Sequence, residues 1–352
     1  MKTILFVGGG SIGHVAPSVA VANSIREHHP ECLMHFICGD QKVEADFIVA
    51  HGFSRDHITP SPSGVHPILG GLFAFHRARK TMKKNPDVIF SKGGALSGSV
   101  CLMAKVRGIP VILHESDAVM GRANTLAIKM GLVHIICTGF PHVSHHSRTI
   151  LTGNPVRTDI VKGSRGQGLA LTGFLGRKPI LLILGGSQGA QFFNEAVRLQ
   201  IDSLLRLCDI IHITGEGKAH APEQLGYWHA EFVHQKLPHL YATADFAMSR
   251  AGAGSIGELA ANAIPTILVP LRGVGHDHQY ANARALEKES ACIHIPQEEL
   301  AEKLVGILTQ LIRSPNMRET LAQNLRKFAT PNASGHIAKI ILQCIEESAG
   351  DA

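Results

Sequence analysis

The chain has 352 residues, of which 45% are hydrophobic and 18% are charged. This composition excludes an intrinsically disordered protein and supplies enough apolar side chains for two domains with buried cores. Aromatic residues make up only 5% of the chain, whereas glycine contributes 36 residues, which favours an α/β protein with tight turns. The net charge of +6 is compatible with phosphate, anionic lipid or nucleic acid as a partner and does not choose among them.

The sequence also indicates a cellular compartment. No run of apolar residues is long enough to span a membrane, and Met1-Lys2 leads directly into an apolar strand pattern without a cleavage site. The seven cysteines are odd in number, lie mostly in apolar runs and form no C-x-x-C pair. We therefore expect a cytoplasmic protein with reduced thiols in its core.

Short apolar runs alternate with longer helical patterns from one end of the chain to the other, which is typical of βαβ units and parallel sheets. The apolar runs predict strands near residues 3–7, 33–38, 88–90, 110–113, 134–137, 180–184, 210–213, 245–248 and 266–269. Helices are predicted after Gly13, over 255–262 and over 333–347. The glycine-rich segment 163–168 is interpreted as a linker.

Two segments of the chain repeat one pattern. Residues 3–14 read T-I-L-F-V-G-G-G-S-I-G-H and residues 179–190 read P-I-L-L-I-L-G-G-S-Q-G-A, each a strand followed by a glycine-rich turn and a helix. This repeat predicts two Rossmann-like α/β domains of similar size. The first domain is expected to cover 1–157, with the C-terminal helix 331–352 packing back on it, and the second to cover 158–330.

The first glycine turn predicts a phosphate site. Gly8, Gly10 and Gly13 form a G-x-G-x-x-G pattern directly after a strand, so backbone N–H groups and a helix N-terminus face a ligand there. His14 follows the last glycine and is a candidate general base, although a histidine that caps or packs the helix fits the same position. With Asp40 after the second strand, the pattern also fits an NAD-dependent oxidoreductase.

A second candidate site lies in the second predicted domain. The turn 185–190 offers backbone donors and the Ser187 hydroxyl, without the lysine of a Walker motif. Residues 249–258 join a strand to a helix through small residues and carry Ser255 and Glu258. The Glu258 carboxylate is interpreted either as a ligand for ribose hydroxyls or as the acid of a capping box with Ser255.

Seven ordered motifs between residues 9 and 283 resemble the MurG family of peptidoglycan glycosyltransferases: G-G-S-I-G-H, S-K-G-G-A-L-S-G, H-E-S-D, G-N-P-V-R, G-G-S-Q-G-A, S-R-A-G-A-G-S-I-G-E and D-H-Q-Y-A-N-A. The resemblance implies a GT-B glycosyltransferase fold with the active site in the cleft between its two domains. It also implies inverting, metal-independent transfer of N-acetylglucosamine from UDP-GlcNAc to the muramyl sugar of undecaprenyl-linked lipid I. The product, lipid II, serves peptidoglycan synthesis and thereby cell-wall biogenesis, cell shape and cell division. The resemblance further implies no cofactor and a peripheral location on the cytoplasmic face of the plasma membrane.

The resemblance also assigns roles to individual residues. It implies that His14 acts as the base beside the muramyl hydroxyl and that Glu115 lies in the same catalytic region. The acceptor side is expected to consist of Gly9, Gly10, Ser11, Gly13, Gly93, Gly94, Ser97 and Asp117. The donor side is expected to consist of Arg157 and Ser187 at the diphosphate, Ala253, Gly254 and Ser255 at a supporting turn, Glu258 at ribose, His278, Gln279 and Asn282 at the sugar, and Phe232 and Val233 at uracil.

The chain departs from the family's pattern at three places. Ile12 stands where the family usually has a glycine, Ala95 replaces a usual aromatic residue, and Ser116-Asp117 replaces Gln-Asn after His-Glu. All three departures lie on the acceptor side, so they concern the acceptor rather than the donor.

Neither a metal nor a nucleic acid is expected as a partner. No D-x-D motif occurs, and Asp277 is expected to orient His278 rather than to bind a cation. The adjacent histidines at 28–29 and 145–146 lack the i, i+4 spacing of a helical metal site and are interpreted as surface residues. The low aromatic content and the absence of a basic stripe disfavour a nucleic-acid binder.

One segment is a candidate membrane contact. The apolar residues 68–75 are followed by a cluster of cations, which fits an anionic leaflet: Arg77, Arg79, Lys80, Lys83 and Lys84. A helix that packs Leu72 and Phe75 into the core fits the same pattern. A UDP-GlcNAc 2-epimerase, or a UDP-sugar transferase with another lipid acceptor, remains the alternative to the lipid I transferase.

Overall fold

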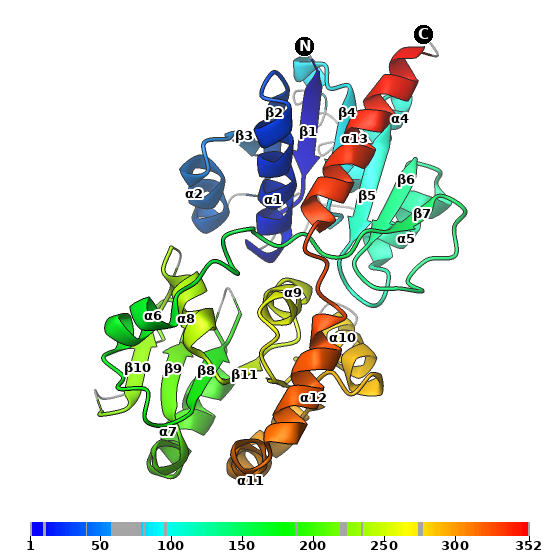
Figure 1. Cartoon of the computed structure of the whole chain (residues 1–352). Helices are drawn as coiled ribbons and strands as arrows, with labels where there is room; N and C mark the ends of the chain where they lie inside the picture. The colour runs from blue at the N-terminus through cyan, green and yellow to red at the C-terminus, as the bar shows by residue number, and fades with distance from the viewer. Residues whose placement is uncertain are drawn as a thin grey trace. The chain divides into compact units, whose positions relative to one another are not determined.

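A computed structural model of the chain describes residues 2–9, 12–39, 41–57, 79, 82–94, 97–186, 189–218, 224–233, 235–273 and 277–350. The chain divides into two compact units (Figure 1). The first comprises Met1–Arg157 together with Pro331–Ala352, and the second comprises Thr158–Thr330. Each unit contains one parallel β-sheet with helices packed on it, so the prediction of two α/β domains is confirmed.

The first unit contains a seven-stranded parallel sheet in the order β3-β2-β1-β4-β5-β6-β7. Its described elements, in chain order, are β1 (Thr3–Val7), α1 (Ile12–His28), β2 (Leu33–Cys38), α2 (Lys42–Ala50), β3 (Ser54–His57), η1 (Met82–Lys84), β4 (Val88–Ser91), α4 (Ser97–Val106), β5 (Val111–Glu115), α5 (Arg122–Lys129), β6 (Ile135–Thr138), β7 (Thr149–Leu151) and α13 (Ala333–Gly350).

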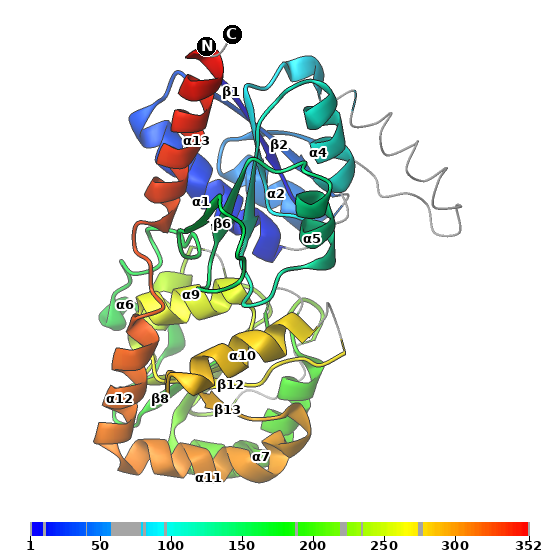
Figure 2. The same ribbon diagram turned by 90° about the vertical axis from the view of Figure 1, so that its right-hand side faces the viewer.

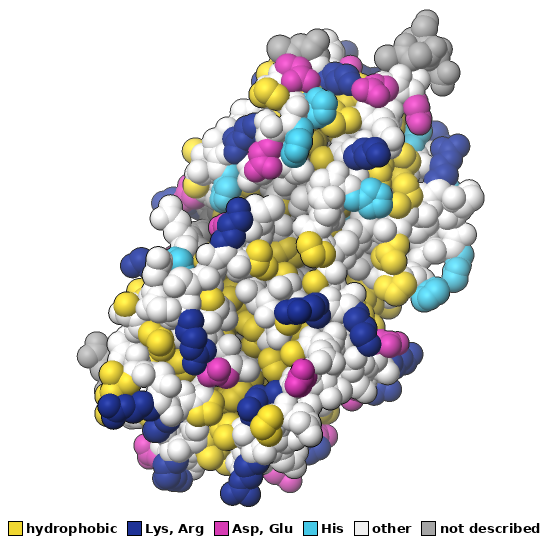
Figure 3. All heavy atoms as spheres, in the orientation of Figure 1, with side chains coloured by type: hydrophobic (Ala, Val, Ile, Leu, Met, Phe, Trp, Pro, Cys, Tyr) yellow, Lys and Arg dark blue, Asp and Glu magenta, His cyan; other side chains and the backbone are white. Residues whose placement is uncertain are grey.

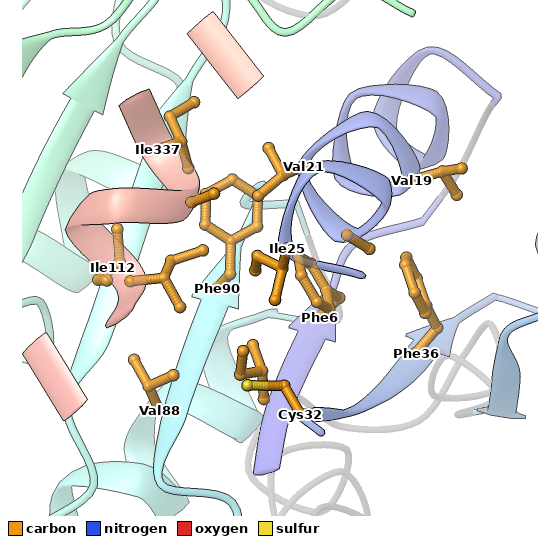
Figure 4. Close-up of a cluster of buried hydrophobic side chains, with 14 of the residues drawn as sticks. Phe6, Val19, Val21, Ile25, Cys32, Phe36, Val88, Phe90, Ile112 and Ile337 are labelled. Carbon is orange, nitrogen blue, oxygen red and sulfur yellow. The ribbon is translucent and has the colours of Figure 1, made fainter. Parts of the chain in front are cut away.

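The central strands of this sheet are buried on both faces, as a parallel sheet requires. Phe6 of β1 faces a cluster formed with α1, α2 and α13, whereas the neighbouring Leu5 faces a second cluster formed with α4 and α5. Ile337 of α13 lies in the first cluster with Val21 and Phe90 (Figure 4). The last helix of the chain therefore completes the hydrophobic core of the first unit.

The second unit contains a six-stranded parallel sheet in the order β10-β9-β8-β11-β12-β13. Its described elements, in chain order, are α6 (Arg165–Thr172), β8 (Ile180–Leu184), α7 (Gln191–Leu207), β9 (Asp209–Ile213), β10 (Tyr227–Ala230), α8 (Leu237–Thr243), β11 (Phe246–Ser249), α9 (Ala253–Ala261), β12 (Thr266–Leu268), α10 (His278–Lys288), β13 (Ile293–His294), η3 (Gln297–Glu299), α11 (Leu300–Arg313) and α12 (Pro315–Arg326).

One face of the second sheet is covered mainly by α7 and α11. Leu300, Leu304, Leu308 and Leu311 recur at helical spacing along α11 and are fully buried. Phe193 of α7 lies in the same cluster. Both helices therefore fix the strands whose carboxyl ends carry the predicted donor motifs.

The interpretation of 163–168 as a linker is wrong at its C-terminal part. The Ser164 hydroxyl accepts a hydrogen bond from the Gln167 N–H and caps α6, which begins at Arg165. A Cβ on Gly168 would lie 1.8 Å from the Thr243 hydroxyl oxygen, so the glycine allows α6 to pack closely on α8. Glycine here serves helix packing rather than flexibility.

The helix predicted over 255–262 begins two residues earlier, at Ala253. Gly252 has extended backbone angles and is the residue before the helix, so Ser255 lies inside the first turn. A capping box requires the serine at the N-cap position, and the capping-box interpretation of Ser255 with Glu258 is therefore wrong.

Candidate functional site

In each sheet the strand order reverses beside its first strand in sequence, between β1 and β4 in the first unit and between β8 and β11 in the second. Open parallel sheets bind ligands outside the carboxyl ends of the strands at such a reversal, because the two following turns diverge there. In the first unit these turns begin at Gly8 and Lys92, and in the second at Gly185 and Arg250. Most of the residues predicted from the sequence lie at or near these two edges.

The two turns of the first unit meet through glycine. A Cβ on Gly94 would lie 3.7 Å from the Gly9 carbonyl oxygen, and Gly94 has a φ of +84° that favours glycine. The Ser97 hydroxyl donates to the Gly93 carbonyl oxygen over 2.6 Å at the start of α4. The structure thus brings together Gly9, Gly94 and Ser97 beside a helix N-terminus, an arrangement that favours an anion.

His14 is the third residue of α1, the helix that follows the carboxyl end of β1. Its imidazole lies outside the described part of the structure, as do Gly10 and Ser11. Gly13, in the same first turn, is exposed. The position of His14 on the backbone suits a base at this edge, and its role remains a prediction.

Glu115, the last residue of β5, is hydrogen-bonded to the loop that follows this strand. Its carboxylate oxygens accept hydrogen bonds from the Asp117 N–H at 3.2 Å, the Gly121 N–H at 2.9 Å and the Asn124 side-chain amide at 2.7 Å. The side chain is buried. These contacts give Glu115 a positioning role for the loop that carries Asp117, whereas a catalytic role stays a prediction.

A buried polar cluster lies beside this loop. Lys92 Nζ lies 2.6 Å from Nδ1 of His114 and also donates to the Ser116 hydroxyl. His114 Nε2 lies 2.9 Å from the Gly153 carbonyl oxygen, and Asn154 donates to the Ser116 carbonyl oxygen over 3.0 Å. Burial and the nearby Lys92 hold the pKa of His114 well below its usual value, so His114 is neutral, donates to Gly153 through Nε2 and accepts at Nδ1.

In the second unit, the turn after β8 depends on Gly189. Gly189 has a φ of +67°, and a Cβ there would lie 2.3 Å from the Thr214 carbonyl oxygen. The Asn194 amide donates to the carbonyl oxygens of Thr214 and Lys218, each over 3.2 Å. The turn is therefore fixed against the loop after β9, while Ser187 lies outside the described residues.

The N-terminus of α9 forms the second part of this edge. No side chain caps the helix at Gly252, and a Cβ on Gly254 would meet nothing within 4 Å. Ala253 is buried, while Gly254 and Ser255 are half-buried in the first turn of the helix. Backbone N–H groups at such a helix start can bind an anionic ligand, as expected for the donor diphosphate.

Glu258 lies one turn further along α9 and is half-buried. One of its carboxylate oxygens accepts a hydrogen bond from the Tyr241 hydroxyl over 2.8 Å. Tyr241 belongs to α8 and is 2% exposed, so its ring is held in the core. This contact orients the carboxylate at the ligand edge of the sheet.

The residues predicted to read the sugar lie in and before α10. The Asn282 amide donates to the Ala251 carbonyl oxygen over 3.0 Å, and the side chain is fully buried. Gln279 accepts from the Leu271 N–H over 3.0 Å, and Asp277 accepts from the Gly273 N–H over 2.6 Å. These contacts hold the loops before α9 and α10, so the structure gives Asn282 and Asp277 positioning roles. His278 is half-buried at the start of α10.

The remaining predicted donor residues lie after β10 and at the boundary between the two units in the sequence. Phe232 and Val233 follow β10, and the Phe232 side chain is 39% exposed. Arg157 is the last residue of the N-terminal segment of the first unit and is half-buried. Within the described residues, no group of three or more histidine, cysteine or carboxylate side chains is arranged to hold a metal ion. Asp40, which supported the NAD alternative, lies outside them.

Sequence reasoning missed Lys92 and Tyr241 as members of these sites. Lys92 was visible as a single cation between a strand and a Gly-Gly turn, yet nothing in the sequence shows that it reaches His114 across the sheet. Tyr241 lies 17 residues before Glu258 in an apolar helix, and no sequence motif marks it as a partner of that carboxylate.

Comparisons with known proteins agree with this architecture. The N-terminal domain of glycosyltransferase family 28 matches residues 4–131, and the C-terminal domain of the same family matches residues 180–337. The crystal structure of Acinetobacter baumannii MurG aligns with a TM-score of 0.76 at 24% identity, covering 97% of this chain and 100% of that chain. UDP-GlcNAc 2-epimerase from Neisseria meningitidis aligns with a TM-score of 0.68 at 13% identity, covering 97% and 100%. The fold and the two edges therefore define a two-domain glycosyltransferase of the GT-B type.

Similar curated proteins identify the family within this class of glycosyltransferases. A Clostridium botulinum protein (strain Hall) named UDP-N-acetylglucosamine--N-acetylmuramyl-(pentapeptide) pyrophosphoryl-undecaprenol N-acetylglucosamine transferase is 34% identical over 361 residues, covering 97% of this chain and 99% of its own length. A Lachnoclostridium phytofermentans protein with the same name is 36% identical over 320 residues, covering 86% and 88%. The chain belongs to this family, the MurG family of N-acetylglucosaminyltransferases.

Proposed function

We propose that the chain transfers N-acetylglucosamine from UDP-GlcNAc to the muramyl sugar of undecaprenyl-diphosphate-linked MurNAc-pentapeptide. The observation that carries this proposal is the near-complete coverage of relatives with that name at 33–36% identity. The two strand-order reversals support it, because they provide one ligand edge in each unit. The 2-epimerase alternative shares the fold, at 12–13% identity to the solved epimerases.

The chemistry is a single displacement. The muramyl hydroxyl oxygen attacks the anomeric carbon of the donor sugar, the bond to the UDP oxygen breaks, and the configuration inverts. His14 takes the hydroxyl proton, a contribution of about 10²- to 10⁴-fold for a well-placed base. The departing diphosphate gains negative charge, which the turn at Gly189, the start of α9 and Arg157 stabilise without a metal ion.

In this proposal each group at the donor edge is assigned to one part of the nucleotide. The first-turn N–H groups of α9 face the diphosphate, and the Glu258 carboxylate, held by Tyr241, accepts from the ribose hydroxyls. Phe232 and Val233 pack beside the uracil. Gln279 and Asn282 hold the loops around the sugar through Leu271 and Ala251.

The decisive experiment supplies labelled UDP-GlcNAc and a lipid I analogue in the presence of EDTA and identifies the product. We expect a lipid-linked disaccharide and one UDP per transfer. Formation of UDP-ManNAc in a reaction without acceptor would instead assign the chain as an epimerase. Transfer to a different polyprenyl-linked sugar but not to lipid I would change the acceptor and point to the residues that depart from the family's pattern.

A peripheral location on the cytoplasmic membrane face is also part of the proposal. No helix within the described ranges is long and apolar enough to cross a bilayer. Segment 68–75 lies outside those ranges, while Arg79, Lys83 and Lys84 are exposed. On the face drawn in Figure 3, Lys and Arg side chains are scattered among Asp and Glu, an arrangement that does not favour a nucleic-acid partner there.

A second surface feature supports lipid contact. Helices α4 and α5 are neighbours (Figure 2), joined where Lys105 Nζ donates to the Met130 carbonyl oxygen over 3.0 Å. Four apolar side chains at i, i+4 spacing are exposed along these helices: Leu102, Val106, Leu126 and Met130. Exposed cations flank them, and each contributes about 1 kcal/mol at an anionic surface: Lys105, Arg107, Arg122 and Lys129.

This surface is testable by sedimentation with phosphatidylglycerol-containing vesicles. We expect the double substitution Leu126→Asp and Met130→Asp to lower the bound fraction several-fold, because it removes apolar area and adds charge repelled by the lipid. Leu199→Asp, at an exposed position of α7, is the matched control and should bind as the wild type does. Equal binding of all three proteins would remove α4 and α5 from the membrane contact.

A further inference from the structure

Lys92 is a buried cation at the ligand edge of the first unit that the proposed reaction does not yet use. It follows β4 directly and precedes the Gly93-Gly94 turn, and it is only 4% exposed. Its Nζ contacts Nδ1 of His114 and the Ser116 hydroxyl. A buried ammonium group is costly unless it is paired, so its presence at this edge calls for a physical reason.

The charges around Lys92 supply that reason. The carboxylates of Glu115 and Asp117 both favour its charged form, although burial lowers the pKa of Lys92 to about 8. Glu115 belongs to β5 and Asp117 to the loop that Glu115 holds. His114 of β5 contacts Lys92 directly and is neutral, because burial and Lys92 hold its pKa well below the usual value. Cys137 of β6 also acts on Lys92, and burial raises its pKa to about 12, so its thiol stays protonated.

The cluster also connects the two acceptor-side segments that the sequence could not relate. Ser116 and Asp117 are adjacent in the loop after β5, and Lys92 interacts with Ser116 by a hydrogen bond and with Asp117 by electrostatic attraction. On its other side Lys92 leads into Gly94, whose backbone faces Gly9. A substitution of Lys92 is therefore expected to disturb both the 116–121 loop and the glycine turns.

We propose that Lys92 is a positioning residue for the acceptor: it holds the 116–121 loop through Ser116 and offsets the Asp117 carboxylate, so that an anionic, diphosphate-linked sugar can bind beside it. This inference rests on the proposed transferase function. We expect Lys92 to affect binding of the acceptor and not of the donor, since each of its contacts described above lies in the first unit.

The test separates the Michaelis constants of the two substrates. For Lys92→Met we expect the KM for a lipid I analogue to rise about tenfold or more, because the ammonium group that offsets the half-buried Asp117 carboxylate at an anion site is removed. The KM for UDP-GlcNAc should stay within about twofold. Ser116→Ala keeps the charge, removes one hydrogen bond and should give a smaller rise. Lys339→Met, at an exposed position of α13, is the matched control and should leave both constants unchanged.

A second substitution that restores the charge balance tests whether the charge of Lys92 matters, because a purely structural role of Lys92 predicts no recovery of the acceptor KM. Adding Asp117→Asn to Lys92→Met should lower the acceptor KM again, because the negative charge that Lys92 offsets in the wild type is gone. In the wild type the acceptor KM should also rise above about pH 8, where Lys92 loses its proton, and Lys92→Met should lack this rise. His114 is already neutral in that range and does not contribute to it.

The outcomes distinguish this inference from the proposed function. If the wild type does not transfer the sugar to lipid I at all, the proposed function fails. If it does, and Lys92→Met changes both KM values equally or the Asp117→Asn addition worsens the acceptor KM further, Lys92 is a structural residue only and the inference is overturned. Thermal unfolding of each variant shows whether a loss of folding accounts for the change.

Discussion

Replacing His14 with alanine should lower kcat by about 10²- to 10⁴-fold, the contribution of a positioned general base. The attacking muramyl hydroxyl is a weak nucleophile until its proton is removed, and His14 is the titratable residue in the first turn of α1, where that helix leaves the carboxyl end of β1. UDP-GlcNAc affinity should remain within about twofold, because the predicted donor contacts lie mainly in the second unit. Steady-state kinetics and calorimetric titration with UDP measure the two effects separately.

His28→Ala is the matched control for this experiment. His28 lies at the opposite end of α1, where Nδ1 contacts the Ser24 carbonyl oxygen over 3.0 Å. Its removal should leave kcat unchanged. A wild-type kcat in the His14→Ala enzyme would remove His14 as the base and leave the helix-capping interpretation of this residue.

The strands that the sequence predicts and those that it misses differ in burial. All nine predicted strands occur, because each of them in the structure contains at least three consecutive buried side chains, and all five are buried in 180–184. The four that were missed are the edge strands of the two sheets: β3, β7, β10 and β13. An edge strand packs against one neighbour only, so short polar sequences such as Ser54–His57 suffice there and carry no apolar signal.

The candidate site shows the same division between local and long-range information. Glycine turns such as 92–96 were predictable, because they follow a strand directly and their spacing is local. The partner of Glu258 was not, since the Tyr241 hydroxyl comes from another helix. The resemblance to the family implied ligand-side roles for Glu115 and Asn282, which stay predictions, and the structure adds that both are bonded to loops of their own units. The partners of Glu115 are near it in sequence and the partner of Asn282 is distant, and in both cases the sequence pattern alone does not show the hydrogen bond.

Glu115 allows these two assignments to be separated by experiment. Glu115→Ala should lower the free energy of unfolding of the first unit by about 3–5 kcal/mol, because it leaves the N–H groups of Asp117 and Gly121 and the Asn124 amide without their shared acceptor. Glu115→Gln retains one carbonyl oxygen and should lose less. Glu27→Ala, at an exposed position of α1, should change the free energy by less than about 0.5 kcal/mol. Denaturant titration followed by a probe in the first unit measures these differences.

Kinetics on the folded fraction of Glu115→Gln then decide between positioning and catalysis. If Glu115 positions the loop that carries Asp117, the acceptor KM should rise while kcat at saturating acceptor changes little. If Glu115 takes part in the chemistry, kcat should fall by a factor of hundreds at unchanged stability. Because three donors converge on this one carboxylate within its own loop, we expect the first result. Two charged side chains would then hold the 116–121 loop on the acceptor side. Glu115 binds the backbone of the loop, and Lys92 binds the Ser116 side chain.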